Sequence, residues 1–164
     1  GRADRPSPLI AGARRRRATF PSIEAAIANY ASKPPLGAFD PAALDAYVRY
    51  GFSANGDGVR LKCAPEHEAQ TFQQSMTSGL WDLLAAIETP TVVISGRVEE
   101  DQASRGAQPA AEQLRNGRYV EVPDLDHFGP FTEPARVADL VAGLVAGLVA
   151  DLASESGPTG SPLR

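Results

Sequence analysis

The sequence lacks several residues on which whole classes of function depend. Cys63 is its only cysteine, so an intrachain disulfide is impossible and a reducing compartment is favoured. Histidine occurs twice, at His67 and His127. Cys63 and His67, with two glutamates beside them, are the one combination that suggests a metal. Because structural zinc usually takes four ligands and no second Cys/His pair exists, we expect no metal, and we expect no cofactor.

Basic charge and long hydrophobic runs are also scarce. The 164 residues carry a net charge of −4, so no positive field draws the chain to nucleic acid or anionic lipid. The basic run at residues 14–17 has no interleaved aromatics, and we interpret it as a solvated helix edge. The longest apolar stretch, residues 137–152, contains two aspartates and is too short to span a bilayer, and the N-terminus lacks the apolar core of a signal peptide. We expect a cytoplasmic protein without nucleic-acid or membrane partners.

A nucleophile elbow of the Gly-x-Ser-x-Gly type is missing too. Its nearest approach is at residues 51–56, where Gly51 stands two positions before Ser53 but Asn55 replaces the second glycine. The elbow needs both glycines because its strained strand-to-helix turn leaves no room for side chains. The residues before Ser53 predict a helix rather than a buried strand. We therefore do not assign Ser53 as a nucleophile.

The first half of the sequence predicts short amphipathic helices separated by prolines. Ser22 is a suitable N-cap for a helix with apolar residues at helical spacing, and Asp40 before Pro41 is suited to cap a second. Pro65 opens a third helix. Residues 80–87 predict a fourth, whose Trp81 we expect to pack in a core. A brief alternation at residues 59–63 predicts one short strand.

The second half contains two strand signals joined by a helical segment. Thr91–Gly96 is an apolar run, residues 107–114 are rich in alanine and typical of a helix, and residues 119–122 alternate as a short strand. Two such strands linked by a helix predict a right-handed parallel β-α-β unit. Residues 134–152 predict a long final helix.

Titratable residues follow each of these strands. An acidic loop with Glu99, Glu100 and Asp101 comes after the first, and His127 comes after the second, preceded by Asp126. Functional residues in parallel sheets gather beyond the carboxyl ends of the strands, so the acidic loop and His127 are expected to be neighbours. A neutral histidine there is able to take a proton from a serine while a carboxylate steadies the imidazolium.

These segments resemble the C-terminal half of the α/β-hydrolase superfamily. Pro90-Thr91-Val92-Val93-Ile94-Ser95-Gly96 resembles the penultimate strand, which precedes the catalytic acid, and His127-Phe128-Gly129-Pro130-Phe131-Thr132-Glu133-Pro134 resembles the catalytic-histidine loop. The helices before them are similar to the lid of such enzymes. The resemblance implies an α/β fold class: a partial α/β-hydrolase fold with a mostly helical lid, a β-α-β unit of two parallel strands and a C-terminal helix.

The resemblance also implies roles for particular residues. Glu99 occupies the family position of the acid, although aspartate is commoner there, and Glu100 and Asp101 are its rivals. His127 takes the place of the general base. Asp126 stands where the family tends to have glycine, and we expect it either to raise the pKa of His127 or to compete with Glu99 for it.

The domain arrangement follows from these assignments. We expect an irregular N-terminal segment at residues 1–13, a helical lid at 14–89, the C-terminal part of the hydrolase core at 90–153 and a disordered tail at 154–164. The family's first strands and serine elbow belong upstream. The chain begins without methionine in a proline-rich segment typical of the middle of a sequence, which suggests a fragment or a processed chain.

Two functions remain open at this point. The first is serine-type hydrolysis of a small ester or related acyl compound in the complete protein, with this chain alone inactive because it lacks the nucleophile. Its partners would be a small-molecule substrate and a missing N-terminal half. The second is a non-catalytic small helical protein that acts through a partner sheet or a homodimer, since strands with open edges tend to associate.

Overall fold

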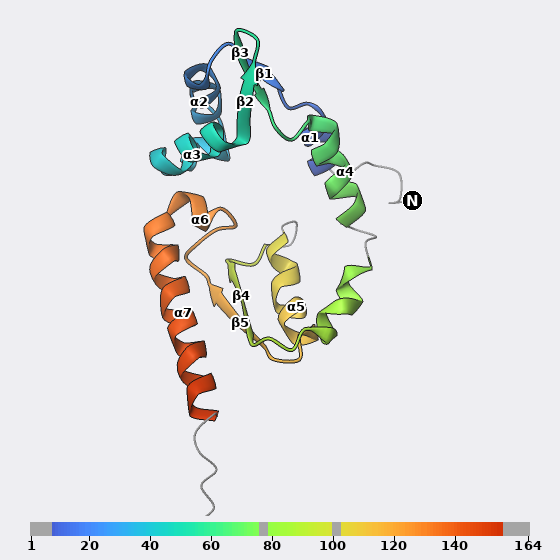
Figure 1. The fold of residues 1–164 in the computed structure, drawn as a ribbon, viewed down its shortest axis with the longest axis vertical. Coiled ribbons are helices and arrows are strands. Elements are labelled where there is room, and N and C mark those ends of the chain that lie inside the picture. Colours follow the sequence, from blue (N-terminus) through green and yellow to red (C-terminus); the bar gives the residue numbers. More distant parts are fainter. Residues whose placement is uncertain (1–7, 76–78, 100–102, 156–164) are drawn as a thin grey trace, which may run out of the picture. The chain divides into compact units, whose positions relative to one another are not determined.

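The chain divides into two units, each with its own internal contacts. The computed structural model describes residues 8–75, 79–99 and 103–155. The N-terminal unit comprises residues 1–83 and the C-terminal unit residues 84–164. Figure 1 shows the elements of both units, and each unit is described by itself.

Proline and N-cap residues set the helices of the N-terminal unit. Its helices are α1 (Pro8–Arg14), α2 (Ile23–Ala31), the 3₁₀ helix η1 (Leu36–Ala38), α3 (Pro41–Gly51) and α4 (Pro65–Ser75). The Ser22 side chain accepts a hydrogen bond from the Ala25 N–H at the start of α2, and Asp40 caps α3 in the same way. Side-chain oxygens at these positions satisfy N–H groups that lack an intrahelical partner. Both predicted caps are confirmed.

The N-terminal unit also contains a small sheet that the sequence did not predict. Within the described residues, β1 (Thr19–Phe20), β2 (Phe52–Asn55) and β3 (Gly58–Leu61) form an antiparallel sheet in the order β1-β3-β2. Gly56, with a φ of 56°, makes the turn between β2 and β3. The expectation of a mostly helical region with one short strand is therefore incomplete. A two-residue strand such as β1 carries no detectable alternation of its own.

Aromatic rings hold this small sheet against α2. The Phe20 ring lies 5.8 Å from Phe52 and 6.0 Å from Tyr30, measured between centroids. Both pairs are tilted or edge-on, which is a favoured geometry for aromatic rings. Val48 of α3 is fully buried in the same unit. These contacts make a core that belongs to the N-terminal unit itself.

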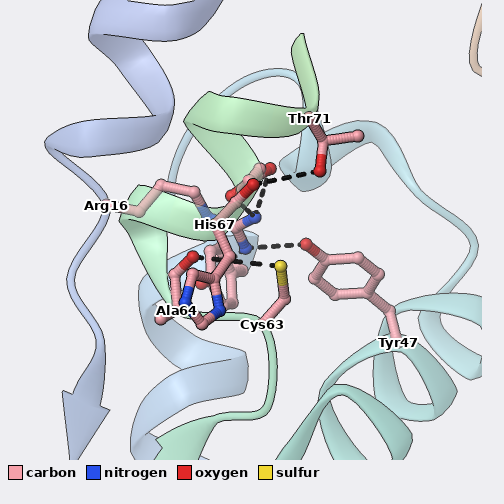
Figure 2. Close-up of polar contacts among 8 residues, drawn as sticks. Arg16, Tyr47, Cys63, Ala64, His67 and Thr71 are labelled. Atoms are coloured by element: carbon pink, nitrogen blue, oxygen red, sulfur yellow. Dashed lines mark hydrogen bonds and ion pairs between the residues drawn. The ribbon is translucent and has the colours of Figure 1, made fainter. Parts of the chain in front are cut away.

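Ion pairs join α1 to α4. Arg14 contacts Glu66 at 2.9 Å, and Arg16 contacts Glu68 at 2.7 Å. Figure 2 shows Arg16 reaching the hydroxyl of Tyr47, to which it donates a hydrogen bond at 2.7 Å. Two members of the basic run are therefore engaged within the unit rather than left solvated. The helix at residues 8–14 also corrects the prediction of an irregular segment, because α4, which stabilises it, is remote in sequence.

The C-terminal unit contains the predicted β-α-β arrangement. Its elements are β4 (Thr91–Gly96), the 3₁₀ helix η3 (Ala103–Gly106), α5 (Ala107–Gln113), β5 (Gly117–Val122), α6 (Gly129–Thr132) and α7 (Pro134–Glu155). β4 and β5 are parallel and in register from Thr91 opposite Gly117 to Gly96 opposite Val122. α5 packs against both strands, and Figure 1 shows α5 and α7 on either side of the strand pair. The mixed α/β fold with two parallel strands and a C-terminal helix is confirmed.

The long helix α7 has two apolar stripes. One contains Val137, Leu140 and Leu144, which are half-buried. The other is exposed and consists of Val141, Val145, Val149 and Leu152. By length and composition alone, Pro134–Ser154 is long and apolar enough to cross a membrane, which differs from the expectation that the apolar stretch at residues 137–152 is too short. α7 also continues two residues into the segment predicted as a tail, and the rest of that tail, residues 156–164, lies outside the described residues.

The connection between the units differs from the prediction. Residues 80–86 form a 3₁₀ helix, η2 (Leu80–Ala86), instead of an α-helix with a buried face. Trp81 is 44% exposed, so the prediction that it packs in a core is wrong. A short 3₁₀ segment superimposes side chains every three residues and does not present the wide apolar face that the α-helical spacing had indicated.

Candidate functional site

The two loops predicted to carry chemistry meet at the carboxyl end of β4. The Arg97 N–H donates a hydrogen bond to the backbone oxygen of Leu125 at 2.7 Å. The backbone of Leu125 and Asp126 also lies directly over Gly96, where a Cβ atom would collide with both carbonyl oxygens. Glycine is required at this position because the approaching atoms belong to the main chain. The first residues after β4 are thus fixed to the residues immediately before His127.

A tight turn presents His127. The Asp126 carboxylate accepts the Phe128 N–H at 2.8 Å, and the Gly129 N–H bonds the Asp126 backbone oxygen at 3.1 Å. This side-chain-to-backbone bond is the usual way in which aspartate stabilises a turn. Asp126 therefore holds the loop conformation, a role that the sequence analysis did not assign to it.

Ion pairs of Arg136 stabilise the same loop. Arg136 at the start of α7 donates to the Asp124 carboxylate at 2.5 Å and to Glu133 at 3.2 Å. The hydrogen bond from Arg136 lowers the pKa of the Asp124 carboxyl below its usual value. The contact links the loop before His127 to the helix after it.

His127 lines a cavity of about 380 Å³ within the C-terminal unit. The walls come from the end of β4, the His127 loop and the first turns of α7, and they are mainly apolar. The polar lining residues are Ser95, Ser104, Asp126 and His127. His127 itself is exposed, and its ring contacts Phe128 edge-on at 5.3 Å between centroids. An exposed imidazole at a cavity wall is accessible to a reacting group.

Glu99 lies in the loop that follows β4. Its Oε1 atom accepts hydrogen bonds from the Arg97 guanidinium at 3.1 and 3.2 Å, and its backbone N–H points to Ser104 Oγ at 3.4 Å. The carboxylate is half-buried. The structure thus brings the Glu99 loop to the His127 loop, while the role of Glu99 stays a prediction. Glu100 and Asp101, its rivals, lie outside the described residues.

Two buried serines near His127 were missed by the sequence analysis. Ser95 is 8% exposed and Ser104 is 6% exposed. The Ser95 hydroxyl bonds the Gly96 backbone oxygen and the Tyr119 hydroxyl, both at 2.8 Å. Ser95 is the penultimate residue of β4, so it does not occupy a strand-to-helix turn. Its position on a predicted parallel strand, one residue before the terminal glycine, was the signal available in the sequence.

The two motifs set aside on sequence grounds have ordinary structural surroundings. Ser53 is exposed within β2, where it pairs with Arg60 of β3. Because β2 is followed by a hairpin turn and not by a helix, Ser53 lacks the setting of a nucleophile elbow. Cys63 Sγ faces the Ala64 backbone oxygen at 3.9 Å (Figure 2). Among the described residues, no group of three or more His, Cys, Asp or Glu side chains is arranged to hold a metal ion.

Comparison with solved structures identifies this arrangement. The fold is similar to that of E-2-(acetamidomethylene)succinate hydrolase, with a TM-score of 0.66 at 17% identity over 84% of this chain. It is also similar to the peroxisomal α/β-hydrolase Lpx1 of Saccharomyces cerevisiae, with a TM-score of 0.68 at 16% identity over the whole chain. The chain has a partial α/β-hydrolase fold.

The match covers only part of each solved structure. This chain spans 50% of the length of the succinate-derivative hydrolase and 46% of the length of the yeast protein, about half in each case. No family model and no curated protein matches the sequence. The fold class inferred from the β4 and His127 segments is confirmed by the structural matches alone.

Proposed function

We propose that this chain is the lid and C-terminal half of a serine-type α/β-hydrolase that acts on a small ester or related acyl compound. The observation that carries the proposal is the junction at the end of β4, where the Arg97–Leu125 hydrogen bond joins the Glu99 loop to the His127 loop beside a cavity. The two solved structures named above are described as hydrolases. The fold likeness supports this reaction class by analogy, and the junction supports it by geometry.

His127 is proposed as the general base. In this chemistry a serine hydroxyl attacks the acyl carbon while a neutral imidazole takes its proton, and the imidazolium later protonates the leaving group. The exposed His127 ring is accessible for both transfers. Asp126 is occupied in holding the turn through the Phe128 N–H, which favours a different carboxylate as the residue that orients the ring.

Glu99 is proposed as that carboxylate. Its contact with Arg97 keeps the side chain near the junction between the two loops. To orient His127, Glu99 would accept the imidazole N–H while Arg97 continues to balance its charge. An acid that stays ionised in this position stabilises the imidazolium as it forms.

The serine is proposed to come from outside this sequence. Ser53 stands in an antiparallel hairpin, and the Ser95 hydroxyl is occupied by its bonds to Gly96 and Tyr119. Neither has the backbone N–H donors and helix that follow the nucleophile in an elbow. A triad without its nucleophile forms no acyl-enzyme, so the isolated chain is expected to be inactive.

The proposal also covers the location and the partners of the protein. We propose a cytoplasmic protein with a small-molecule substrate and without a nucleic-acid or membrane partner. The net charge of −4 supports this, as does the use of Arg14 and Arg16 in ion pairs with α4. A non-catalytic role through a partner sheet or a homodimer is the second candidate. It is favoured by the sheet of β4 and β5, whose outer edges pair with no other strand among the described residues.

Activity-based labelling tests the proposed function. The chain is incubated with a fluorophosphonate, which labels activated serines, first alone and then with the polypeptide encoded directly upstream of Gly1. The expected result is no labelling and no turnover of p-nitrophenyl acetate by the chain alone, with both appearing in the mixture and the label on the upstream polypeptide. Labelling of Ser53, Ser95 or Ser104 in the isolated chain would contradict it, as would an inactive, unlabelled mixture.

A further inference from the structure

A second pocket, of about 380 Å³, lies in the N-terminal unit. Its lining comes from β1 and the residues next to it and from the β2–β3 hairpin, whose strands lie side by side in Figure 1. The volume falls within the range of about 300–1,000 Å³ that small-molecule sites occupy. The polar lining residues are Arg17, Thr19, Asn55 and Asp57. The pocket shares no lining residue with the cavity beside His127, so it is a separate site.

Two contacts hold the guanidinium of Arg17 at this pocket. Its Nε–H donates a hydrogen bond to the Thr19 backbone oxygen at 2.9 Å, and its Cζ atom lies 4.4 Å from the centre of the Phe20 ring. An aromatic face attracts a guanidinium placed over it. Among the described residues, no acceptor bonds the two terminal nitrogens of Arg17. These nitrogens present a planar pair of donors, which suits bidentate binding of a carboxylate.

The hairpin turn brings a carboxylate to the same pocket. Asp57 stands between Gly56, which makes the turn with a φ of 56°, and Gly58, which packs closely on β1. A Cβ atom at position 58 would collide with the Phe20 backbone oxygen, so the turn approaches β1 only because this residue is glycine. Within the described part of the chain, the Asp57 side chain makes no hydrogen bond and no ion pair, including with Arg17.

These two charges restrict the ligand that the pocket suits. Arg17 and Asp57 are the charged members of its lining among the described residues. A simple anion would be attracted by Arg17 and repelled by Asp57, and a simple cation would meet the opposite pair of effects. A ligand that carries both charges gains from both residues. We propose that this pocket binds a small zwitterion, whose carboxylate accepts hydrogen bonds from Arg17 and whose ammonium group donates to Asp57.

The rest of the polar lining fits such a ligand. Thr19 and Asn55 are exposed at the pocket and supply neutral donors and acceptors beside the two charges. Amino acids and short peptides with free termini carry one carboxylate and one ammonium group, so they are the class of compound that this lining matches. The site belongs to the N-terminal unit and does not depend on the proposed hydrolase function.

A titration of the whole chain with glycylglycine, followed by NMR, tests the site. We expect saturable shifts of the Arg17 Nε–H and of the Gly58 and Val59 amides, with a dissociation constant in the millimolar range because the contacts are few and exposed. N-acetylglycylglycine lacks the ammonium group and glycylglycinamide lacks the carboxylate. Each should bind about fivefold more weakly, the usual effect of losing one exposed charged contact. Glycine and triglycine, with other charge separations, distinguish a free amino acid from a peptide.

Charge variants provide the matched measurement on the protein. Arg17→Gln and Asp57→Asn are each expected to weaken glycylglycine binding by about fivefold, and Arg17→Lys should also weaken it because an ammonium group has no planar pair of donors. Arg15→Gln and Asp139→Asn make the same changes of charge at exposed positions outside the pocket, and they should alter binding by less than about twofold. The NMR spectrum of each variant establishes that it is folded, and the comparison of ligands needs no variant.

Several results would overturn the proposal. They are the absence of saturable shifts with glycine, glycylglycine and triglycine, equal binding of the N-acetylated peptide, and equal losses from Arg15→Gln and Arg17→Gln. Shifts centred on His127 would also contradict it, because they would place the ligand in the C-terminal unit. The titration uses this chain alone and measures no turnover. Its outcome is therefore independent of whether the chain and its upstream polypeptide hydrolyse an ester.

Discussion

The backbone oxygen of Asp126 lies against the Cα of Gly96, at the point where β4 ends and the His127 turn begins. The Leu125 oxygen is slightly farther away and would stand 2.7 Å from a Cβ atom at position 96. Contacts under 3 Å between a Cβ atom and a main-chain oxygen require the backbone to shift. The position of His127 therefore depends on Gly96, because a side chain at the end of β4 would displace the backbone that precedes His127.

Replacing Gly96 should displace the His127 loop. We expect Gly96→Ala to destabilise the protein by about 1–3 kcal/mol, the usual cost of forcing added atoms into a packed site. Gly143→Ala is the matched control, because a Cβ there meets nothing within 4 Å and lies on α7. Alanine in a helix is favoured over glycine by about 1 kcal/mol, so this control should be neutral or stabilising. Denaturant unfolding of both variants measures the difference, and equal stabilities would contradict the account.

The Arg16 cluster should make a larger contribution than the rest of the basic run. Arg16 donates to Glu68, Tyr30 and Tyr47 at distances between 2.7 and 3.1 Å. Burial of its guanidinium lowers the Arg16 pKa, but the hydrogen bonds that it donates to Tyr30 and Glu68 outweigh this effect and raise the pKa. Arg16→Gln should cost about 1–3 kcal/mol, the usual range for hydrogen bonds to a charged group.

Arg15 provides the control for that measurement. It is exposed beside Arg16 in the same run, so Arg15→Gln removes an equal charge at a neighbouring position. A surface substitution of this kind usually changes stability by less than about 0.5 kcal/mol. Chemical unfolding monitored by circular dichroism compares the two. Similar losses from both variants would mean that the four arginines act through charge alone.

Two carboxylates should contribute to the loss of stability as the pH falls into the acid range. The pKa of Glu66 is lowered by its hydrogen bond to Arg14, and that of Asp124 by its hydrogen bond to Arg136. A carboxyl whose folded pKa is depressed contributes stability above its unfolded pKa, and this contribution is lost as the pH falls through the folded pKa. We expect Arg14→Gln and Arg136→Gln each to flatten the fall in melting temperature below about pH 4, near the ordinary carboxyl range.

The control for this titration is Arg15→Gln, which removes an equal positive charge from an exposed position of the basic run. Melting temperatures are measured from pH 7 to pH 3. A parallel fall in all variants, including the unsubstituted protein, would contradict the contribution of these two pairs.

Local signals in the sequence were sufficient to locate the C-terminal unit. β4 contains the apolar run Val92-Val93-Ile94, α5 is alanine-rich, and α7 has apolar residues at helical spacing, so period and composition identified each element. Asp40 before Pro41 and Ser22 gave helix starts for the same reason. A parallel β-α-β unit then follows from the order of the elements and the right-handed crossover.

The elements that were missed depend on residues far away in the sequence. β1 has two residues and exists because it pairs with β3, about 40 residues later. α1 is joined to α4 by the ion pair between Arg14 and Glu66. The Asn55-Gly56 turn was the one local signal for the hairpin, and it was obscured by the resemblance of Ser53 to an elbow. Trp81 was expected in a core because its spacing is helical, but burial requires a partner surface that spacing does not reveal.

The candidate site was predictable to a similar extent. Glu99 and His127 were located from their positions after two strands, which the parallel topology brings to one edge. The contacts that arrange them were not predictable, because the Gly96–Asp126 approach, the Asp126–Phe128 turn and the Arg97–Leu125 bond are defined only in three dimensions. Ser95 was marked in the sequence only by its place before the glycine that ends β4, and nothing local marks Ser104 as a cavity residue.

Hydrolysis by the chain combined with its upstream polypeptide tests the central proposal most directly. His127→Ala and His67→Ala replace the two histidines of the chain, of which His67 is exposed on α4 and has no proposed role. With p-nitrophenyl acetate, His127→Ala should lower kcat by about a thousandfold or more, as expected for loss of a general base, while His67→Ala retains full activity. Equal activity of the two variants would contradict the account.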